Sequence, residues 1–359
     1  MSAIHQKQIL CGLDDREMKE LVVQEGIPAF RAKQLLEWIY DKNIAQINEA
    51  KNLPKDLLKR LSQKYQATSL ALVESRASSD QESTKYLFRT EDDHLLESVL
   101  IVQQNRRTVC VSTQLGCKIG CTFCASGKGK FIRNLTAGEI IEQVAFIQKE
   151  TKKKVTNVVF MGMGEPLDNF KETMKALKIL QASWGFELGA RRITVSTSGI
   201  TPKILEFVQC SEGRVRLSVS LHAVSEKLRS ELVPINKKYS LKALIDALRQ
   251  IHGKLKREIT FEYTLINGIN DSVEDARGLG KIAKSLNAKV NIIPYNTIRD
   301  ADYQTPSDET IKMFKEVMHE HQVRITIRQT AGRDINAACG QLRLEHLNKK
   351  QPSRIKDFF

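Results

Sequence analysis

Cys117-Lys-Ile-Gly-Cys121-Thr-Phe-Cys124 places three cysteines within eight residues, and this stretch determines how the rest of the chain is interpreted. The chain has seven cysteines, and an odd number clustered in this way makes a poor disulfide framework. Three thiolates on one tight loop can hold three irons of a cubane cluster and leave the fourth iron open. A structural zinc site needs four closed ligands, and no fourth candidate stands nearby in the sequence. The spacing predicts an iron–sulfur cluster on Cys117, Cys121 and Cys124, with structural zinc or spare thiols as the simpler alternatives.

Strand-like and helical segments alternate along the chain from Cys110 onward. Repeated βα units of this kind build a parallel sheet or a barrel. Six or seven units are too few for a closed eight-fold barrel, so we predict an α/β fold with an open, partial (βα)6-type barrel. The predicted parallel strands are Asn157–Met161, Arg192–Ser196, Val215–Ser220, Ile259–Tyr263, Val290–Ile293 and Val323–Ile327.

The pattern changes along the chain and divides it into four predicted segments. Residues 1–76 have helical periodicity and many charges, which predicts a small helical accessory domain. Residues 77–106 contain a polar linker and a β-hairpin extension. Residues 107–335 form the barrel, and residues 336–359 form a C-terminal segment.

The charge balance favours a polyanionic partner. Lysine and arginine outnumber aspartate and glutamate by 56 to 42, a net charge of +14, and nucleic acid is the first partner to consider. Arg31 and Lys33, near Trp38 and Tyr40, offer charge and stacking surfaces for folded RNA. No apolar run reaches the ~18–20 residues of a membrane span and no signal-peptide core is present, so we expect no membrane contact and a cytoplasmic location. The basic runs, which could contact phosphate or simply face solvent, are Lys149, Lys152, Lys153 and Lys154; Lys254, Lys256 and Arg257; and Lys349, Lys350, Arg354 and Lys356.

Candidate ligand residues recur where successive predicted strands end. In a partial barrel the carboxyl ends of the strands build the active site. Met161-Gly-Met-Gly-Glu165 follows one strand, where Gly164 lets the backbone approach a ligand and Glu165 could pair with an ammonium group. Each such residue taken alone is more simply interpreted as capping the end of its strand. Because these residues recur at the carboxyl ends of successive strands, which form one rim of the barrel, a ligand site is favoured. The other candidates in this rim are Ser196, Ser220, Leu221, His222 and Asn296.

Together these stretches resemble the RlmN/Cfr family of radical S-adenosylmethionine (SAM) methyltransferases over nearly the whole chain. The resemblance implies a [4Fe-4S] cluster whose open iron chelates SAM, and it implies methylation of C2 of adenosine in 23S rRNA. RlmN-type enzymes also methylate the adenosine 3′ to the anticodon in some tRNAs, whereas Cfr-type enzymes methylate C8 of the rRNA adenosine. Pro166 resembles the RlmN type, because Cfr-type sequences typically carry Ala there. The matching stretches are Phe30–Tyr40, Cys110–Cys117, Gly162–Leu167, Val195–Gly199, Ser220–Ala223 and Ala337–Leu342.

The same resemblance implies roles for three further residues. Cys339 matches the cysteine that takes a methyl group from one SAM and becomes S-methylcysteine. A second SAM is cleaved to a radical that removes hydrogen from this methyl group, and the resulting carbon radical adds to C2. Glu97 matches the base for the C2 proton, and Cys110 matches the thiol that resolves the protein–RNA adduct through a transient disulfide with Cys339. Two SAM molecules per turnover, an electron donor such as flavodoxin and a monomeric enzyme are the corresponding expectations.

One part of this assignment can be examined on the residues alone. If Gln104-Asn105 centre a two-residue turn, paired strand positions sum to 209. Glu97 then faces Ser112, and Cys110 projects from the same side of the hairpin. Without the family, Glu97 would be interpreted as an exposed charge on an edge strand.

Two other functions remain open at this stage. A radical SAM enzyme acting on a protein or small molecule shares the cluster, but it leaves Cys110 and Cys339 without a role and does not need the positive charge. A non-enzymatic RNA-binding module with a structural metal explains the charge without iron. Cys339, flanked by Ala338 and Gly340, would then be only a small buried residue.

Overall fold

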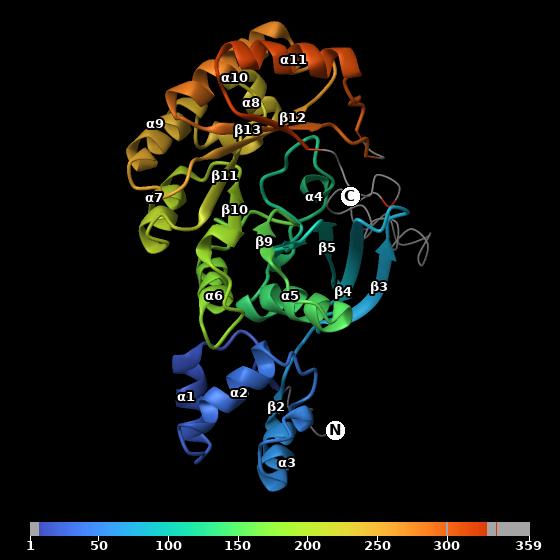
Figure 1. Ribbon diagram of the computed structural model, residues 1–359, viewed down its shortest axis with the longest axis vertical. Helices are drawn as coiled ribbons and strands as arrows, with labels where there is room; N and C mark the ends of the chain where they lie inside the picture. Colours follow the sequence, from blue (N-terminus) through green and yellow to red (C-terminus); the bar gives the residue numbers. More distant parts are fainter. Residues whose placement is uncertain (1–6, 299–300, 329–334, 336–359) are drawn as a thin grey trace.

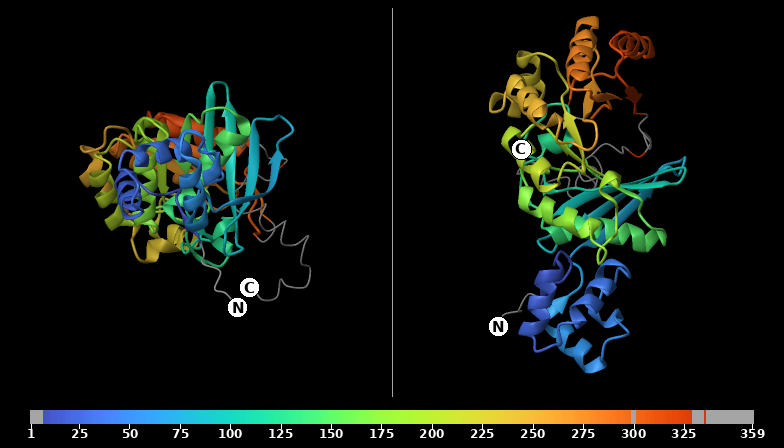
Figure 2. Two further views of the ribbon diagram at one scale, coloured as in Figure 1. Left: turned by 90° about the horizontal axis from the view of Figure 1, so that it is seen from below. Right: turned by 60° about the vertical axis from the view of Figure 1, so that its left-hand side comes forward.

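The structure, a computed structural model, describes residues 7–298, 301–328 and 335. A helical unit at the N-terminal end is followed by one large mixed sheet with helices along its outer face (Figure 1). The right-hand view of Figure 2 shows that the helical unit lies below the sheet. No helix in the described ranges is long and apolar enough to span a membrane.

Three amphipathic helices form the N-terminal unit. The first begins at a capping box in which the Asp14 side chain accepts from backbone N–H groups and Glu17 bonds back to the Asp14 N–H. Two short parallel strands close the unit. The helical prediction is therefore confirmed as far as Lys64. The elements are α1 (Asp15–Gln24), α2 (Arg31–Tyr40), α3 (Lys55–Lys64), β1 (Gln8–Ile9) and β2 (Tyr65–Gln66).

Tyr40 anchors this unit rather than presenting a surface to RNA. Its side chain is fully buried, its hydroxyl donates to the Leu13 carbonyl at 2.7 Å, and it accepts from the Gly12 N–H at 2.9 Å. Its ring packs at 5.8 Å from Trp184 and 6.1 Å from Phe186, which follow a barrel helix. The expectation that Tyr40 offers a stacking surface is wrong, because the ring is used in the contact between the unit and the barrel.

The prediction of helix up to residue 76 is also wrong at its end, because Ala71–Ala77 forms a strand antiparallel to the next one. Glu74 and Arg76 alternate on one face of this strand and pair at 2.9 Å. Ala71, Leu72 and Glu74 are residues that helices favour, so the composition predicts a helix, and pairing with the next strand overrides that preference. The antiparallel strands are β3 (Ala71–Ala77), β4 (Ser83–Arg89), β5 (Leu95–Gln103) and β6 (Arg106–Cys110).

The parallel half of the sheet confirms the partial (βα)6 barrel. β6 pairs in parallel with β9, and the ten strands run in the order β14-β13-β12-β11-β10-β9-β6-β5-β4-β3. β14 and β3 do not pair with each other in the described part, so the barrel stays open. The strands are β9 (Asn157–Phe160), β10 (Ile193–Thr197), β11 (Arg216–Ser220), β12 (Thr260–Leu265), β13 (Lys289–Pro294) and β14 (Ile325–Ile327). The helices are α5 (Ala137–Thr151), α6 (Phe170–Gln181), α7 (Thr201–Cys210), α8 (Glu226–Leu232), α9 (Leu241–His252), α10 (Val273–Ser285) and α11 (Asp308–Glu320).

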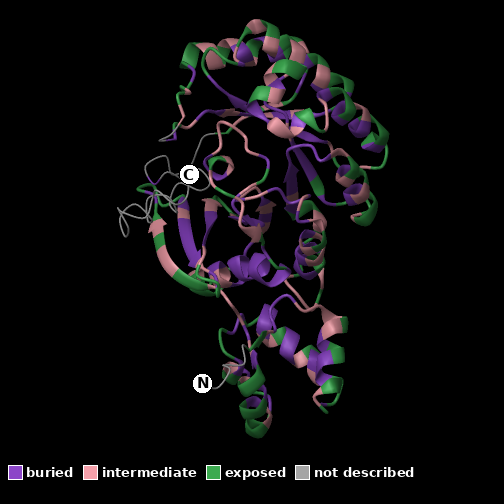
Figure 3. Cartoon of the chain, turned by 180° about the vertical axis from the view of Figure 1, so that it is seen from behind, coloured by how far each residue is buried: buried purple, intermediate pink, exposed green. Residues whose placement is uncertain are grey.

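The two faces of the parallel strands differ in chemistry. In β11, Leu217 and Val219 pack in the main hydrophobic core, whereas Arg216 and Ser218 line a cavity on the other face. Figure 3 shows the same division, with buried strands inside and exposed residues on the outer sides of the helices. Parallel strands covered by apolar layers on both faces are apolar throughout. The polar inner face therefore indicates a ligand-filled interior.

A buried carboxylate connects the barrel to the N-terminal unit. Glu142 of α5 accepts from the backbone N–H of Ser69 at 2.8 Å and of Leu70 at 2.6 Å, in the connection between β2 and β3. Burial raises the pKa of Glu142 to about 8. This residue therefore holds its proton in the folded state over much of the neutral range.

Candidate active site

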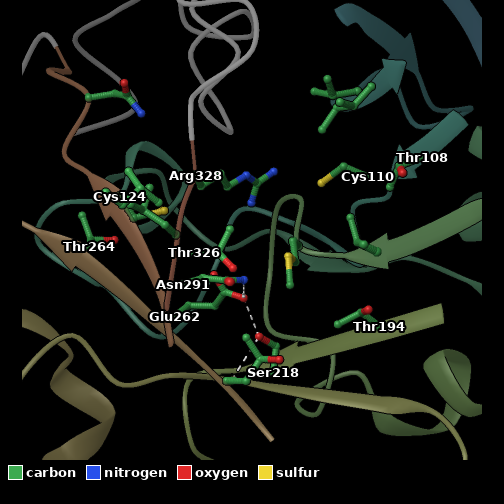
Figure 4. A pocket seen from close by; sticks show the side chains of 18 of the residues that line it. Thr108, Cys110, Cys124, Thr194, Ser218, Glu262, Thr264, Asn291, Thr326 and Arg328 are labelled. Atoms are coloured by element: carbon green, nitrogen blue, oxygen red, sulfur yellow. Dashed lines mark hydrogen bonds between the residues drawn. The ribbon is translucent and has the colours of Figure 1, made fainter. Parts of the chain in front are cut away.

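The curled sheet encloses a cavity of about 670 Å³ on its inner face. Strands from β5 to β14 contribute side chains to it, and Figure 4 shows them converging from opposite walls. Of the predicted site residues, Cys110, Cys124 and Asn296 line this cavity. The fold therefore brings the cysteine loop and the hairpin thiol to one space, although they lie on different walls.

The three-cysteine loop packs over the carboxyl ends of β11, β12 and β13. Gly116 begins it with a φ of +77°, and a Cβ there would lie 2.2 Å from the Lys130 carbonyl oxygen, so the loop closes tightly on itself. Beneath it lies a small hydrophobic cluster of Ile119, Ala125, Ala223, Leu232, Val233, Ile266, Tyr295 and Ile298. The elements around the loop are β7 (Gln114–Leu115), α4 (Ala125–Lys128) and β8 (Arg133–Asn134).

The donor set of this loop fits a cubane better than a single ion. Burial raises the pKa of the Cys117 thiol to about 12 and raises that of Cys121 well above its ordinary value, with the Cys124 charge adding to both. In the described ranges no three Cys, His, Asp or Glu side chains converge on one ion position. A cubane binds each cysteine sulfur to a different iron, so its three ligands need not converge. Three half-buried thiols around one loop therefore suit a cluster that stabilises their ionised form.

The loop after β9 is held by its glutamate. Gly164 has a φ of +99°, and a Cβ there would lie 2.5 Å from the Gln114 Cβ. Glu165 Oε2 accepts from the Ser198 N–H and hydroxyl, both at 2.7 Å, and Oε1 accepts from the Leu167 N–H at 3.0 Å. Burial raises the pKa of Glu165, although these donors favour its charged form. Glu165 therefore links the loops after β9 and β10, which gives it a positioning role that the sequence did not suggest.

Residues 220–222 end β11 in a strained conformation. His222 has a φ of +58°, its Nδ1 accepts from the Thr264 N–H at 2.9 Å, and its ring lies edge-on at 4.7 Å from Phe123 of the cysteine loop. Burial lowers the pKa of His222 to about 3, so the imidazole is neutral. The histidine thus connects two barrel strands to the cysteine loop. Of the other predicted rim residues, Ser196 and Leu221 are buried and Ser220 is half-buried.

The predicted hairpin register is confirmed. Val99 pairs with Cys110, and the pairing continues to the turn with residue numbers that sum to 209. The Ser112 hydroxyl donates to the Glu97 carbonyl at 2.6 Å, as facing positions should. Glu97 is only 3% exposed, so its interpretation as an exposed edge charge is wrong, because β4 and β3 extend the sheet beyond β5. Cys110 is buried.

Two family models match the chain, one over the N-terminal helical unit and one over the barrel. Residues 9–66 match the model of the ribosomal RNA large subunit methyltransferase N-terminal domain, and residues 111–279 match the radical SAM superfamily. A protein of Nautilia profundicola named dual-specificity RNA methyltransferase RlmN is 41% identical over 96% of this chain and 99% of its own length. A protein of Acholeplasma laidlawii, named a probable dual-specificity RNA methyltransferase RlmN, is 42% identical over 94% of this chain and all of its own. The chain belongs to the RlmN family.

A solved structure agrees with this assignment. The crystal structure of a radical SAM methyltransferase from Sphaerobacter thermophilus matches with a TM-score of 0.88 and 41% identity, over 93% of this chain and 98% of that one. The chain is therefore a radical SAM methyltransferase of the RlmN family, and the alternative of a non-enzymatic binding module is wrong. Radical SAM enzymes use a [4Fe-4S] cluster and SAM, which agrees with the donor set of the cysteine loop. Cys339 lies outside the described residues.

Arg229 holds together the strand ends that form the predicted SAM site, and the sequence did not identify it. Arg229 of α8 is fully buried and donates to the carbonyl oxygens of Ser198 at 2.7 Å, Ser220 at 3.2 Å and Leu221 at 3.1 Å. It also donates to the Asn236 side chain at 2.8 Å, and burial lowers its pKa to about 10. In the sequence it is one charge in a charged helix, so only the fold could identify it.

Proposed function

We propose that this chain methylates C2 of adenosine in 23S rRNA and the adenosine 3′ to the anticodon in some tRNAs, with S-methylcysteine at Cys339 as intermediate. The observation that carries the proposal is the hairpin β5–β6. Glu97 and Cys110 lie on one face of it, and Cys110 lines the same cavity as Cys124. A base and a thiol beside the cluster are what release of a protein–RNA adduct requires. The names of the relatives, as RNA methyltransferases, support the choice of substrate.

The target carbon explains why radical chemistry is needed. C2 of adenine is an electron-poor sp² carbon that does not attack a SAM methyl group as a nucleophile. When bound at Cys117, Cys121 and Cys124, the cluster with SAM supplies the radical that removes hydrogen from the S-methyl group. The protein's task is to hold the methyl carrier, the base and the resolving thiol in order.

The steps carried by the chain's own residues balance in atoms and electrons. The Cys339 sulfur takes a methyl group from one SAM, which leaves as S-adenosylhomocysteine, and a second SAM is used for hydrogen removal. After the methylene radical has joined C2, the ring carries one unpaired electron. Glu97 takes the C2 proton and that electron leaves the ring; the cluster, once oxidised by cleavage of SAM, would be its acceptor, so the adduct becomes closed-shell. The Cys110 sulfur then attacks the Cys339 sulfur, forming an S–S bond as the S–C bond breaks, and the electron pair of that bond stays on carbon. This carbon takes up a proton and becomes the methyl group, and the disulfide is reduced before the next turnover.

A basic pocket supports an RNA partner. It has a volume of about 420 Å³ at the amino-terminal ends of β11 to β14. Arg324 pairs with Glu258, whereas no ion pair among the described residues neutralises Arg216, Arg257 or Lys289. Burial and the neighbouring Arg216 charge lower the pKa of Lys289, and the opposite charge of Glu262 does not offset them, so the pocket keeps an excess of cations. RNA phosphates would supply the counter-charge.

The basic pocket distinguishes between two of the basic runs. Lys256 and Arg257 line it, which favours their run as a phosphate contact. Lys149 of the other run pairs with Glu49 at 3.3 Å. We place the reaction in the cytoplasm, with a monomeric enzyme and a donor such as flavodoxin, because the three-cysteine cluster loop suits a reducing compartment and the chemistry needs a low-potential electron.

The direct test is product analysis. Cluster-loaded protein is incubated anaerobically with SAM, a reductant and a 23S rRNA fragment, and the digested RNA is compared with authentic nucleosides by chromatography and mass spectrometry. We expect 2-methyladenosine. A product that is mainly 8-methyladenosine would assign the chain to the Cfr type despite Pro166.

Two cysteine variants test the mechanism. Cys110→Ala should trap RNA on the protein, because the S–C bond can no longer be broken, and Cys339→Ala should form no adduct. Cys210→Ala, which removes an exposed thiol, is the matched control and should behave like the unmodified protein. Full methylation by Cys339→Ala would contradict the mechanism.

A further inference from the structure

A carboxylate inside the barrel has one oxygen without a partner. Glu262 lies on the inner face of β12 and is 5% exposed. Its Oε1 accepts from the Ser218 hydroxyl at 2.6 Å and from the Asn291 amide at 3.1 Å (Figure 4). Its Oε2 is buried and accepts no hydrogen bond from any described residue.

The Oε2 atom of Glu262 is a hydrogen-bond acceptor whose position is fixed before any ligand binds. A buried carboxylate oxygen without a donor is unfavourable, because the water that it gave up is not replaced. The two donors on Oε1 fix the carboxylate plane, and both come from neighbouring strands in the middle of the sheet. The free lone pairs of Oε2 are therefore held ready for an N–H or O–H group of a molecule in the cavity.

The position of Glu262 separates it from the predicted SAM rim. Glu262 lies opposite Ser220 and Asn291 in the strand register, but its carboxylate bonds to Ser218. Ser218 precedes Ser220 by two residues, so it lies roughly 7 Å further toward the amino-terminal ends of the strands. At that end, Arg216 and Lys289 line both the cavity and the basic pocket.

Glu262 also lies across the cavity from the resolving thiol. β6, which carries Cys110, is separated from β12 by β9, β10 and β11, and the curled sheet places the two side chains on opposite walls (Figure 4). An adenine between these walls has its C2 carbon and its N6 amino group on the same edge, separated by N1. The amino group is a donor, whereas guanine carries an acceptor oxygen at the corresponding position.

We propose that Glu262 recognises the target adenine by accepting a hydrogen bond from its exocyclic N6 amino group. This inference rests on the proposed function, since it takes adenosine as the substrate. Glu262 acts as a specificity residue that orients C2 toward the reacting sulfur. SAM also carries N–H and O–H donors, so the experiment has to distinguish the two adenosines.

The test combines a change in the protein with a change in the base. Two RNA fragments are prepared that are identical except at the target position, where one has adenosine and the other purine riboside, which lacks the N6 amino group. For the unmodified protein, loss of the amino group should lower kcat/KM for methylation by about 10- to 100-fold. For Glu262→Ala the two RNAs should differ by less than about threefold, because the partner of the amino group is already gone. Glu262→Gln, which keeps the shape and one acceptor oxygen, should fall between them.

Two further measurements keep the test decisive. Binding of SAM to the cluster-loaded protein without RNA should be unchanged in Glu262→Ala. Glu274→Ala, the same chemical change on the exposed face of α10, serves as the matched control. If Glu262→Ala weakens SAM binding, or if the variant and the base change reduce the rate independently, the assignment to the target adenine is overturned.

RNA binding can be measured without turnover and gives a second, independent test. The affinities of both RNAs for the unmodified protein and Glu262→Ala are compared by filter binding, and only the unmodified protein should discriminate between them. Equal affinities for the two RNAs in the unmodified protein would overturn the inference. Failure to form any methylated nucleoside would instead count against the proposed function, and the binding arm would still decide the role of Glu262.

Discussion

Arg229 provides a test of how the active-site rim is held. Arg229 is the largest fully buried residue in the described part of the chain. Its guanidinium donates to main-chain oxygens at the ends of β10 and β11. These two strands carry Ser196 and Ser220. Arg229→Met keeps the length and apolar stem of the side chain but removes every donor.

The expected loss of stability can be worked from these contacts. A hydrogen bond from a charged group contributes about 1.5–3 kcal/mol, and Arg229 makes four such contacts. Burying the guanidinium is itself unfavourable, and water can enter the variant, so the net loss should be smaller than the sum. We expect about 3–5 kcal/mol, the range found when one partner of a buried charged network is removed. This is a large part of the ~5–15 kcal/mol by which a folded protein is usually stable.

The assay is urea unfolding of the cluster-loaded protein under anaerobic conditions, followed by circular dichroism and by loss of bound iron. Arg229→Met should lower the urea midpoint by more than about 1 M. Arg229→Lys keeps the charge but has fewer donors, and it should be intermediate. The control is Arg249→Met on α9, where the arginine is 59% exposed and pairs with Asp246, and its midpoint should hardly move. If Arg229→Met unfolds at the same urea concentration as Arg249→Met, the bracing role is refuted.

Three further outcomes can be measured separately. Replacing Cys117, Cys121 and Cys124 together by Ala should abolish iron binding and SAM cleavage, and a normal iron and sulfide content in the variant would contradict the cluster assignment. Glu142 holds its proton up to about pH 8 when folded but loses it near 4.5 when unfolded, so stability should fall as pH rises between these values; Glu142→Gln should flatten that decline in urea titrations, and an unchanged slope would refute the cause. Arg257→Ala should weaken RNA binding and reduce the slope of log affinity against log salt by about 1, whereas an unchanged slope would remove Arg257 from the phosphate contacts.

Much of the site could be predicted because it depends on local spacing. Three cysteines in eight residues limit which cofactor one loop can hold, independently of the rest of the chain. The register that places Glu97 and Cys110 on one face follows from the two-residue turn and the period of two in a strand. Alternating βα segments likewise predict parallel strands, because short helical crossovers have few other ways to pack.

Other features depended on contacts that no local pattern contains. Ala71–Ala77 lies at the end of a segment whose residues fit a helix, and it becomes a strand only because β4 offers it a partner edge. Tyr40 has the sequence context of a surface aromatic, but the barrel covers it.

The roles of Arg229 and Glu262 were decided by the tertiary structure alone. Each is one charged residue among many in the sequence, and each became important when strands distant in the chain brought it acceptors or donors. Burial raises the free energy of any polar group whose partners are missing. The sequence by itself therefore determined the chemistry of the cysteine loop and the pairing of the hairpin. The curling of the sheet determined which charges are buried, what they bond to and which oxygen is left for a ligand.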